Sequence, residues 1–129
     1  KFESDHEPPK DRVHDKKSIY KSKDLKLYKT IIQVGKGVHR PAKYDEIKYK
    51  LLKLEDANSS NNTEKLQEQE VLTVNLGMNK YESWFDRIVE NVRKDEICLA
   101  TIKRISKLPG SDQKVQNLEY YQIHLIDWT

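Results

Sequence analysis

Apolar and polar residues alternate along five segments of the chain, and this period of two is typical of β-strands with one buried face. The segments are residues 25–35, 47–52, 71–76, 96–102 and 119–128. In the first segment Tyr28, Thr30, Ile32 and Val34 share one face. The apolar faces of the last three are Leu72, Val74 and Leu76; Cys98, Ala100 and Ile102; and Tyr121, Ile123 and Leu125.

A short helix is predicted between the third and fourth strands. Ser83 is a suitable N-cap residue, and Asp86 three residues later approximates a capping box. Apolar residues then recur at helical spacing, which places Phe85, Ile88, Val89 and Val92 on one stripe. The pattern therefore predicts an α+β domain, in which an antiparallel sheet of five to six strands wraps around one short helix.

Three segments lack any apolar period. Residues 1–24 are rich in charge, and we expect a flexible leader or linker before a domain that spans residues 25–129. Residues 57–70 are polar and predict a surface loop or a frayed edge. Residues 103–117 predict a basic loop that is broken at Pro109–Gly110.

Composition narrows the class of protein. The formal net charge is only +3, with 24 basic and 21 acidic residues interspersed, so nucleic-acid binding is not indicated. The single cysteine, Cys98, excludes a disulfide framework and indicates a reducing compartment, where we expect a buried, inert thiol. No segment predicts a membrane span, and the four histidines are isolated. We expect a cytoplasmic or nuclear protein with no metal and no cofactor.

Four stretches together resemble an FKBP-type peptidyl-prolyl isomerase domain. They are Gly35-x-Gly37, the strand IKYKLLKL, the block LTVNLGMNKYESWFDRIVENVRKDEICLATI and the closing YYQIHLIDW. The family's middle motif can be laid on residues 77–102 without a gap. Its ring, acid, valine, methionine and glutamate positions then fall on Phe85, Asp86, Val89, Val92 and Glu96.

The resemblance implies an apolar pocket with an aromatic floor at the helix start. A prolyl amide rotates over a barrier of ~18–20 kcal/mol, because resonance holds its C–N bond planar. The twisted amide is less polar than the planar one, so an apolar site that excludes water stabilises it preferentially. Such a site needs no nucleophile, no acid and no metal.

Several residues depart from the family's pocket. The resemblance places the pocket at Leu51, Leu72, Tyr81, Glu82, Phe85 and Tyr121. Leucines replace aromatic residues at two of these positions, and Glu82 would bring a carboxylate into an apolar site, which is costly if unpaired. The segments that carry further pocket aromatics in the family, residues 57–67 and 103–117, have none here. Trp84 and Asp95 replace family glycines.

We therefore expect a non-catalytic FKBP-like domain that serves as an interaction or spacer module. By resemblance, it would belong to a multidomain immunophilin that reaches a chaperone complex through neighbouring domains. A weak isomerase with a shallower pocket is the alternative, and nucleic-acid binding ranks last. Trp84 and Trp128 are candidate contact residues, and the candidate interaction loop comprises Lys103, Arg104, Lys107, Leu108 and Pro109.

Overall fold

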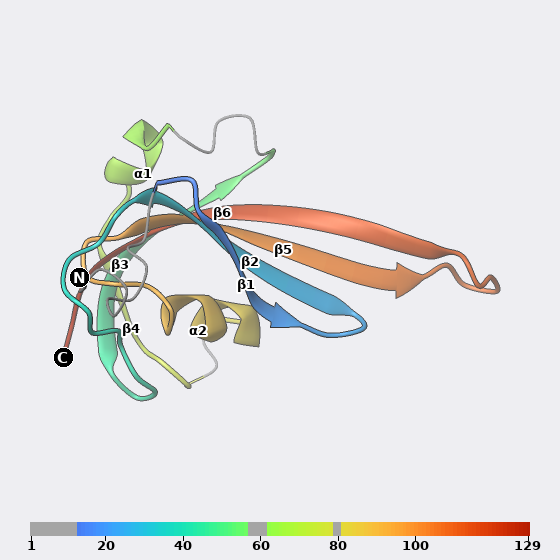
Figure 1. Ribbon diagram of the computed structural model, residues 1–129, viewed down its shortest axis with the longest axis horizontal. Coiled ribbons are helices and arrows are strands. Elements are labelled where there is room, and N and C mark those ends of the chain that lie inside the picture. Colours follow the sequence, from blue (N-terminus) through green and yellow to red (C-terminus); the bar gives the residue numbers. More distant parts are fainter. Residues whose placement is uncertain (1–12, 57–61, 79–80) are drawn as a thin grey trace, which may run out of the picture.

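The computed structural model describes residues 13–56, 62–78 and 81–129 of the chain, and these form one antiparallel sheet with two short helices (Figure 1). The sheet order is β1-β2-β5-β6-β3-β4. The strands are β1 (Lys16–Lys21), β2 (Leu25–Gln33), β3 (Glu46–Leu54), β4 (Leu72–Asn75), β5 (Ile97–Lys107) and β6 (Lys114–Trp128), and the helices are α1 (Glu64–Gln67) and α2 (Ser83–Val89). The predicted α+β architecture is confirmed.

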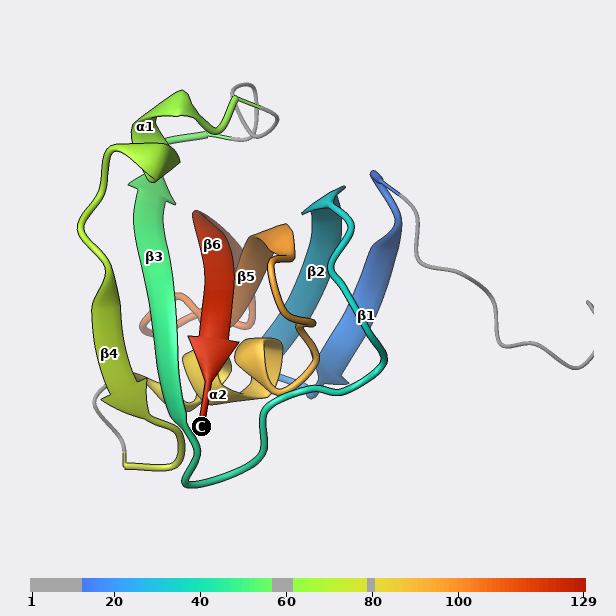
Figure 2. The same ribbon diagram turned by 90° about the vertical axis from the view of Figure 1, so that its left-hand side faces the viewer.

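The sheet curves around α2, and the hydrophobic core lies between them (Figure 2). The predicted helix stripe is confirmed, because its four residues have no exposed surface. From the sheet, the core receives Leu27, Ile47, Tyr49, Cys98, Ala100, Ile102, Ile123 and Leu125. Full burial of each leucine or isoleucine side chain contributes about 1.5–3 kcal/mol to the stability of the fold.

Helix α1 lies on the opposite side of the sheet from α2 (Figure 1). Two hydrogen bonds attach this region to the sheet: Lys50 Nζ donates to the Gln67 carbonyl at 2.6 Å, and Gln122 Nε2 donates to the Asn62 carbonyl at 2.9 Å. Its one apolar anchor, Leu66, is fully buried. The prediction for residues 57–70 is therefore wrong for α1. The sequence did not indicate this helix, because a single apolar residue cannot form a helical period. Residues 57–61 lie outside the described residues.

The predicted leader also contains a strand. Residues 16–21 form β1, which pairs with β2 from Lys16–Thr30 to Lys21–Lys26. The prediction of a flexible leader up to residue 24 is therefore wrong for β1. Only Ile19 and Tyr20 of this strand pack against the core, so β1 is stabilised mainly by backbone hydrogen bonds to β2. Backbone hydrogen bonds do not require alternating apolar residues, so the sequence of β1 shows no strand pattern. Residues 1–12 of the leader lie outside the described residues.

The predicted basic loop over residues 103–117 is mostly a β-hairpin. Strand β5 runs to Lys107 and β6 begins at Lys114, and the two pair along their length from Lys107–Lys114 to Ile97–His124. This part of the hairpin is solvated on both faces, so apolar residues do not alternate there and the sequence gives no strand signal.

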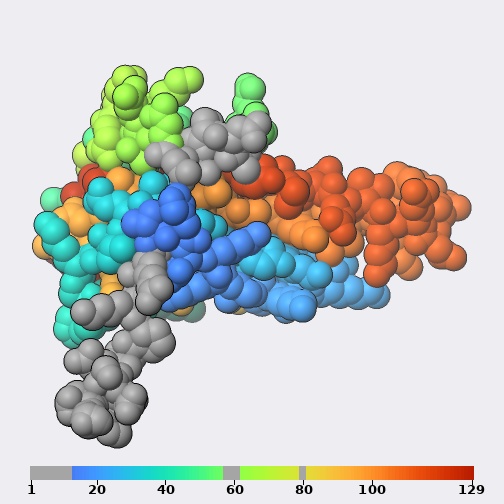
Figure 3. Space-filling model, turned by 45° about the horizontal axis from the view of Figure 1, so that its top comes forward, coloured from blue at the N-terminus to red at the C-terminus, as the bar shows by residue number. Residues whose placement is uncertain are grey.

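The outer part of this hairpin projects past its neighbours. Strand β5 pairs with β2 only as far as Leu25–Arg104, and β6 pairs with β3 only as far as Leu54–Tyr120. We call residues 105–119 the arm. It forms the long extension of the molecule in Figures 1 and 3.

Candidate functional site

Trp84 and Phe85 begin α2 and are both buried, with exposed fractions of 5% and 0%. Phe85 contacts Tyr49 and Tyr81, with ring centroids 5.2 and 4.5 Å apart. Trp84 stacks on Tyr121 of β6, with ring centroids 4.6 Å apart. The two helix residues also meet edge to face at 5.9 Å. Five rings from β3, β6, α2 and the segment just before α2 therefore form one aromatic cluster: Tyr49, Tyr81, Trp84, Phe85 and Tyr121.

The predicted helix start is off by one residue. Glu82 is the N-cap and its side chain makes no capping hydrogen bond, so the predicted Ser83–Asp86 capping box is wrong. Asp86 instead accepts a hydrogen bond from the Gly77 N–H at 3.2 Å, and burial raises the pKa of this carboxyl. Gly77 takes a φ of +83°, which glycine adopts without strain. Asp86 thus fixes the turn that leads from β4 into the helix.

Tyr49 is the aromatic residue that the sequence reasoning did not assign to the site. It is fully buried on β3, and its hydroxyl is 2.6 Å from the Tyr81 hydroxyl. Burial and this neighbour raise the pKa of Tyr49 far above its ordinary value. The alternation of β3 already turns Tyr49 inward, but the resemblance assigned the ring position to Leu51, two residues on. The alternation of apolar and polar residues in β3 therefore indicated Tyr49, but the alignment with the family motif directed attention to Leu51.

Four of the predicted pocket residues are partly exposed and pack against the hydrophobic core: Leu51, Leu72, Tyr81 and Tyr121. Among them, Tyr81 contacts the Phe85 ring directly, and Tyr121 contacts Trp84. The resemblance did not assign Tyr49 or Trp84 to the pocket, but both rings contact Phe85 and help to cover it.

Glu82 lies outside this cluster. Its side chain is 66% exposed, and Arg104 donates to it at 3.0 Å, so the expectation of a carboxylate inside the pocket is wrong. The Arg104 Nε also donates to Glu119 at 2.6 Å, and this bond is the main reason why the pKa of Arg104 is raised. Arg104 therefore links the start of α2 to the base of the arm, which explains how a charged residue fits at a family pocket position.

The candidate interaction loop divides between a strand and a turn. Lys103, Arg104 and Lys107 belong to β5, and only Leu108 and Pro109 lie in the turn at the tip of the arm. Leu108 is 42% exposed there. Of the candidate contact residues, Trp84 is buried in the aromatic cluster and cannot meet a partner, whereas Trp128 is partly exposed.

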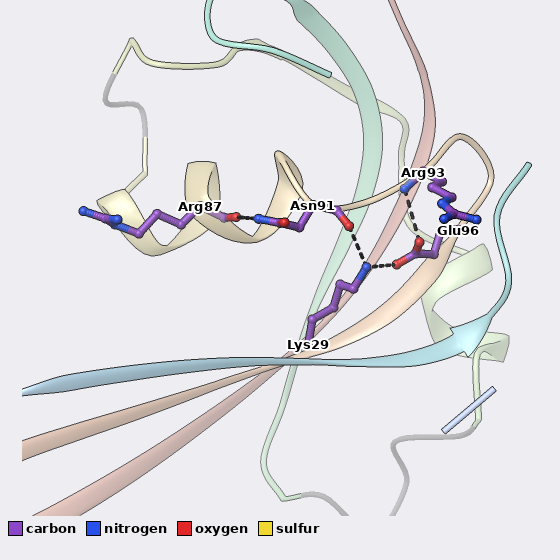
Figure 4. Close-up of polar contacts among 5 residues, drawn as sticks. All are labelled: Lys29, Arg87, Asn91, Arg93 and Glu96. Carbon is purple, nitrogen blue, oxygen red and sulfur yellow. Dashed lines mark hydrogen bonds and ion pairs between the residues drawn. The ribbon is translucent and has the colours of Figure 1, made fainter. Parts of the chain in front are cut away.

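A buried ion pair holds the other end of α2. Lys29 of β2 reaches Glu96 with its Nζ 2.8 Å from Oε2, and both side chains are almost completely buried (Figure 4). Lys29 Nζ also donates to the Asn91 carbonyl at 2.6 Å, just past the helix, and Glu96 Oε1 accepts the Arg93 N–H at 3.2 Å. The predicted family glutamate position thus has a structural role, and its lysine partner was not predicted.

Asp95, where the FKBP resemblance places a glycine, takes a backbone conformation that favours glycine. Its φ is +62°, a left-handed conformation that aspartate tolerates better than most residues but that glycine adopts freely. Here the side chain is used, because Asp95 pairs with Lys36 at 3.1 Å and lies 3.6 Å from His124 Nε2. These partners lower the pKa of the Asp95 carboxyl, with Lys36 as the main cause.

Solved structures with the same architecture are FKBP domains. The three FKBP domains of wheat FKBP73 match with a TM-score of 0.56 and 20% identity, over 80% of this chain and 46% of that one. The N-terminal domain of FKBP42 from Arabidopsis thaliana matches with a TM-score of 0.54 and 18% identity, over 95% of this chain and 97% of that one. A multi-domain immunophilin from the same plant matches with a TM-score of 0.54 and 21% identity, over 94% and 47%.

The chain therefore has the fold of an FKBP domain. It spans about half the length of two of these three structures, those of FKBP73 and the multi-domain immunophilin. No family model matches the chain, and no curated protein matches it in sequence. No helix in the described part of the chain is long and apolar enough to cross a membrane.

Proposed function

We propose that this domain is a non-catalytic FKBP-like module that serves protein interaction or spacing in a multidomain immunophilin. The observation that carries the proposal is the complete burial of Phe85 beneath the rings of Tyr49, Tyr81 and Trp84. In the resemblance, this residue is the floor on which a substrate proline would rest. The floor of this domain is occupied by its own side chains.

The chemistry explains why a covered floor argues against catalysis. An isomerase of this type accelerates rotation by surrounding the twisted amide with apolar surface and excluding water. That surface must be accessible to a peptide. Displacing Trp84 to reach Phe85 would sacrifice the stack on Tyr121 and the burial of a large ring, which costs several kcal/mol. Such a cost would be added to every binding event.

The alternative is a weak isomerase, and one observation favours it. Leu51, Leu72 and Tyr121 pack against the core and are partly exposed, so an apolar surface remains at these residues. A proline could rest on this surface without reaching Phe85. Contact on one side only would leave the amide largely hydrated, so we expect any such activity to be small.

A prolyl-isomerase assay and an NMR titration with an FKBP-type macrolide, performed on the same folded sample, test the proposal. We expect no acceleration above the uncatalysed rate and no chemical-shift changes at Tyr81 or Tyr121, with an active FKBP domain as the positive control. Catalysis that Tyr121→Ala abolishes without unfolding the domain would contradict the proposal and support the weak isomerase.

The wider setting is part of the proposal. A chaperone-associated immunophilin of the cytoplasm or nucleus would carry this domain beside others, and those neighbours would make the contact with the chaperone. Support comes from the multidomain character of two structures with this fold. Co-purification of the full-length protein with chaperones from a cell extract, compared with the isolated domain, tests it. Equal recovery with the isolated domain would contradict the division of roles.

A further inference from the structure

Lysine side chains surround a hollow between the β1–β2 turn and the arm. One part of about 540 Å³ is lined by Lys21, Ser22, Lys23, Lys26, Ile105, Lys114 and Gln116. An adjoining small hollow is lined by Lys23, Asp24, Ile105, Ser106, Lys107 and Lys114. The two share Lys23, Ile105 and Lys114, so they form one surface, which we call the lysine hollow. Figure 3 shows the β1–β2 hairpin ending beside the base of the arm.

The charge of the lysine hollow is unbalanced. Five lysines line it, and Asp24 is the single acidic residue among its described lining residues. None of these five lysines takes part in an ion pair among the described residues. The whole chain has 24 basic and 21 acidic residues, so much of its small excess of positive charge is concentrated here. Like charges held together repel one another, and an anionic ligand would relieve that repulsion.

A strand edge is open beside the lysine hollow. The pairing of β2 with β5 ends at Leu25–Arg104, and the Ile105 N–H makes one more bond, to the Asp24 carbonyl at 2.9 Å. Alternate residues of an antiparallel strand direct their backbone groups to the same side. The N–H and C=O of Lys107 therefore point in the same direction as those of Ile105, past the last residue of β2. An extended peptide could pair there as an added strand.

We infer that the lysine hollow binds an acidic, extended segment of a partner protein, added as a strand at the edge of β5 around Lys107. Alternate glutamates or aspartates of this segment would lie on the face of the sheet that carries Lys107, and would pair there with Lys23, Lys107 and Lys114. The inference rests on the proposed function, because it names the class of partner for an interaction module.

The lining favours a peptide over a nucleic acid. Single strands bind to proteins through aromatic rings on which bases stack, with arginine often contributing. Neither an aromatic ring nor an arginine lines the lysine hollow in the described part of the chain. An open strand edge offers peptide-like hydrogen bonds instead. Lysines at an edge can also act only to prevent aggregation between copies, and the experiment must separate this role from binding.

Fluorescence anisotropy with a labelled synthetic peptide of alternating glutamate and valine tests the inference. Charge reversal in the double variant Lys23→Glu, Lys114→Glu removes two attractions and adds repulsion, so we expect roughly tenfold weaker binding. The matched control is Lys48→Glu, Lys65→Glu, which makes the same change of net charge at exposed positions on β3 and α1. The control should bind as the unmodified chain does. Equal weakening in both variants would overturn the inference.

Two further comparisons examine the strand edge and the ligand class. Lys107→Pro removes a backbone donor, whereas Lys107→Gln removes only the charge, so the proline variant should bind more weakly. Equal binding of these variants would contradict strand addition. A peptide with glutamine in place of glutamate should not bind, and oligothymidine should bind more weakly than the acidic peptide. Tighter binding of oligothymidine, or equal binding of the glutamine peptide, would overturn the inference.

The isomerase assay separates this inference from the proposed function. Catalysis by the unmodified chain contradicts the proposed function, whatever the peptide does. Absence of both catalysis and peptide binding overturns only the present inference and leaves the domain as a module with a different partner.

Discussion

Trp84 and Tyr121 stack with their ring centroids 4.6 Å apart and their planes at 29°, and this contact joins the first turn of α2 to the central strand β6. In the FKBP resemblance the position of Trp84 is a glycine, which would leave that space open. Here an indole fills it and meets Phe85 with its edge. The indole of Trp84 is therefore part of the hydrophobic core.

Replacing Trp84 by glycine should destabilise the domain while exposing Phe85. Loss of a large buried aromatic side chain costs about 3–5 kcal/mol, and glycine in the first turn of a helix adds to the cost. Urea denaturation followed by circular dichroism measures the loss. The matched control, Trp128→Phe, changes a partly exposed ring and should cost much less. Equal losses in the two variants would mean that Trp84 contributes little to the core.

If the Trp84→Gly variant remains folded, it should bind an FKBP-type macrolide that the unmodified chain does not bind. The reason is that the indole occupies the space above Phe85. An NMR titration of both proteins measures this. A folded variant that still binds nothing would show that Tyr49 and Tyr81 suffice to close the site, and would shift the explanation to these residues.

Removing one partner of the Lys29–Glu96 ion pair should destabilise the domain much more than removing both partners. Lys29→Met leaves the Glu96 carboxylate buried without its counter-charge, and breaking such a pair costs about 3–5 kcal/mol. The double variant Lys29→Met, Glu96→Met removes both charges and should recover most of this loss. Denaturation of the two single variants and the double variant gives the coupling energy. Additive losses would contradict a strong mutual dependence of the two residues.

The strands and the helix whose apolar residues lie on one core-facing side could be predicted from the sequence. Segments β3, β4 and α2 all carry residues whose spacing matches their burial. The helix start was missed by one residue, since Glu82 caps α2 without the side-chain hydrogen bond that the prediction relied on. In β2 the buried residues are Leu27, Lys29 and Ile31, the face opposite to the one with Tyr28 and Thr30. A lysine in the buried face concealed that pattern, because its counter-charge comes from Glu96, far along the chain.

The arm and β1 could not be predicted, because backbone pairing stabilises them and no apolar period accompanies it. Within the candidate site, Phe85 and Tyr121 were predicted through the resemblance, and their contacts with Tyr49 and Trp84 were not. Ring contacts of this kind depend on how a helix is placed against a sheet, and local spacing carries no information about that placement. The same limit applies to Arg104, whose two carboxylate partners come from α2's N-cap and from β6.

Cys98 should be unreactive in the folded domain. Its thiol has no exposed surface, and burial, together with the nearby Glu96 carboxylate, raises the thiol pKa far above its ordinary value. Little thiolate is therefore present at pH 8, and a reagent cannot reach it. Labelling with a chromogenic disulfide reagent should be slow in buffer and fast in urea. Fast labelling in buffer would indicate frequent local opening of β5. Lys29→Met should accelerate labelling in proportion to its loss of stability.

His124 should make the domain less stable as the pH falls below 6.5. Burial lowers the pKa of this imidazole from 6.5 in spite of Asp95, whose carboxylate lies 3.6 Å away and acts in the opposite direction. The unfolded chain therefore binds a proton at a higher pH than the folded chain does. Stability is then present above pH 6.5 and is lost as the pH falls towards the lower folded pKa.

Urea denaturation of the unmodified chain and of His124→Gln at pH 7.5 and 5.5 measures this dependence. The unmodified chain should lose more stability between the two pH values than the variant, because glutamine has no proton to bind. The effect of Asp95 does not interfere, since its pKa is lowered from 3.8 and its contribution is lost only at more acidic pH. Equal losses in both proteins would mean that Asp95 compensates fully for the burial of His124, and that another group controls stability in this range.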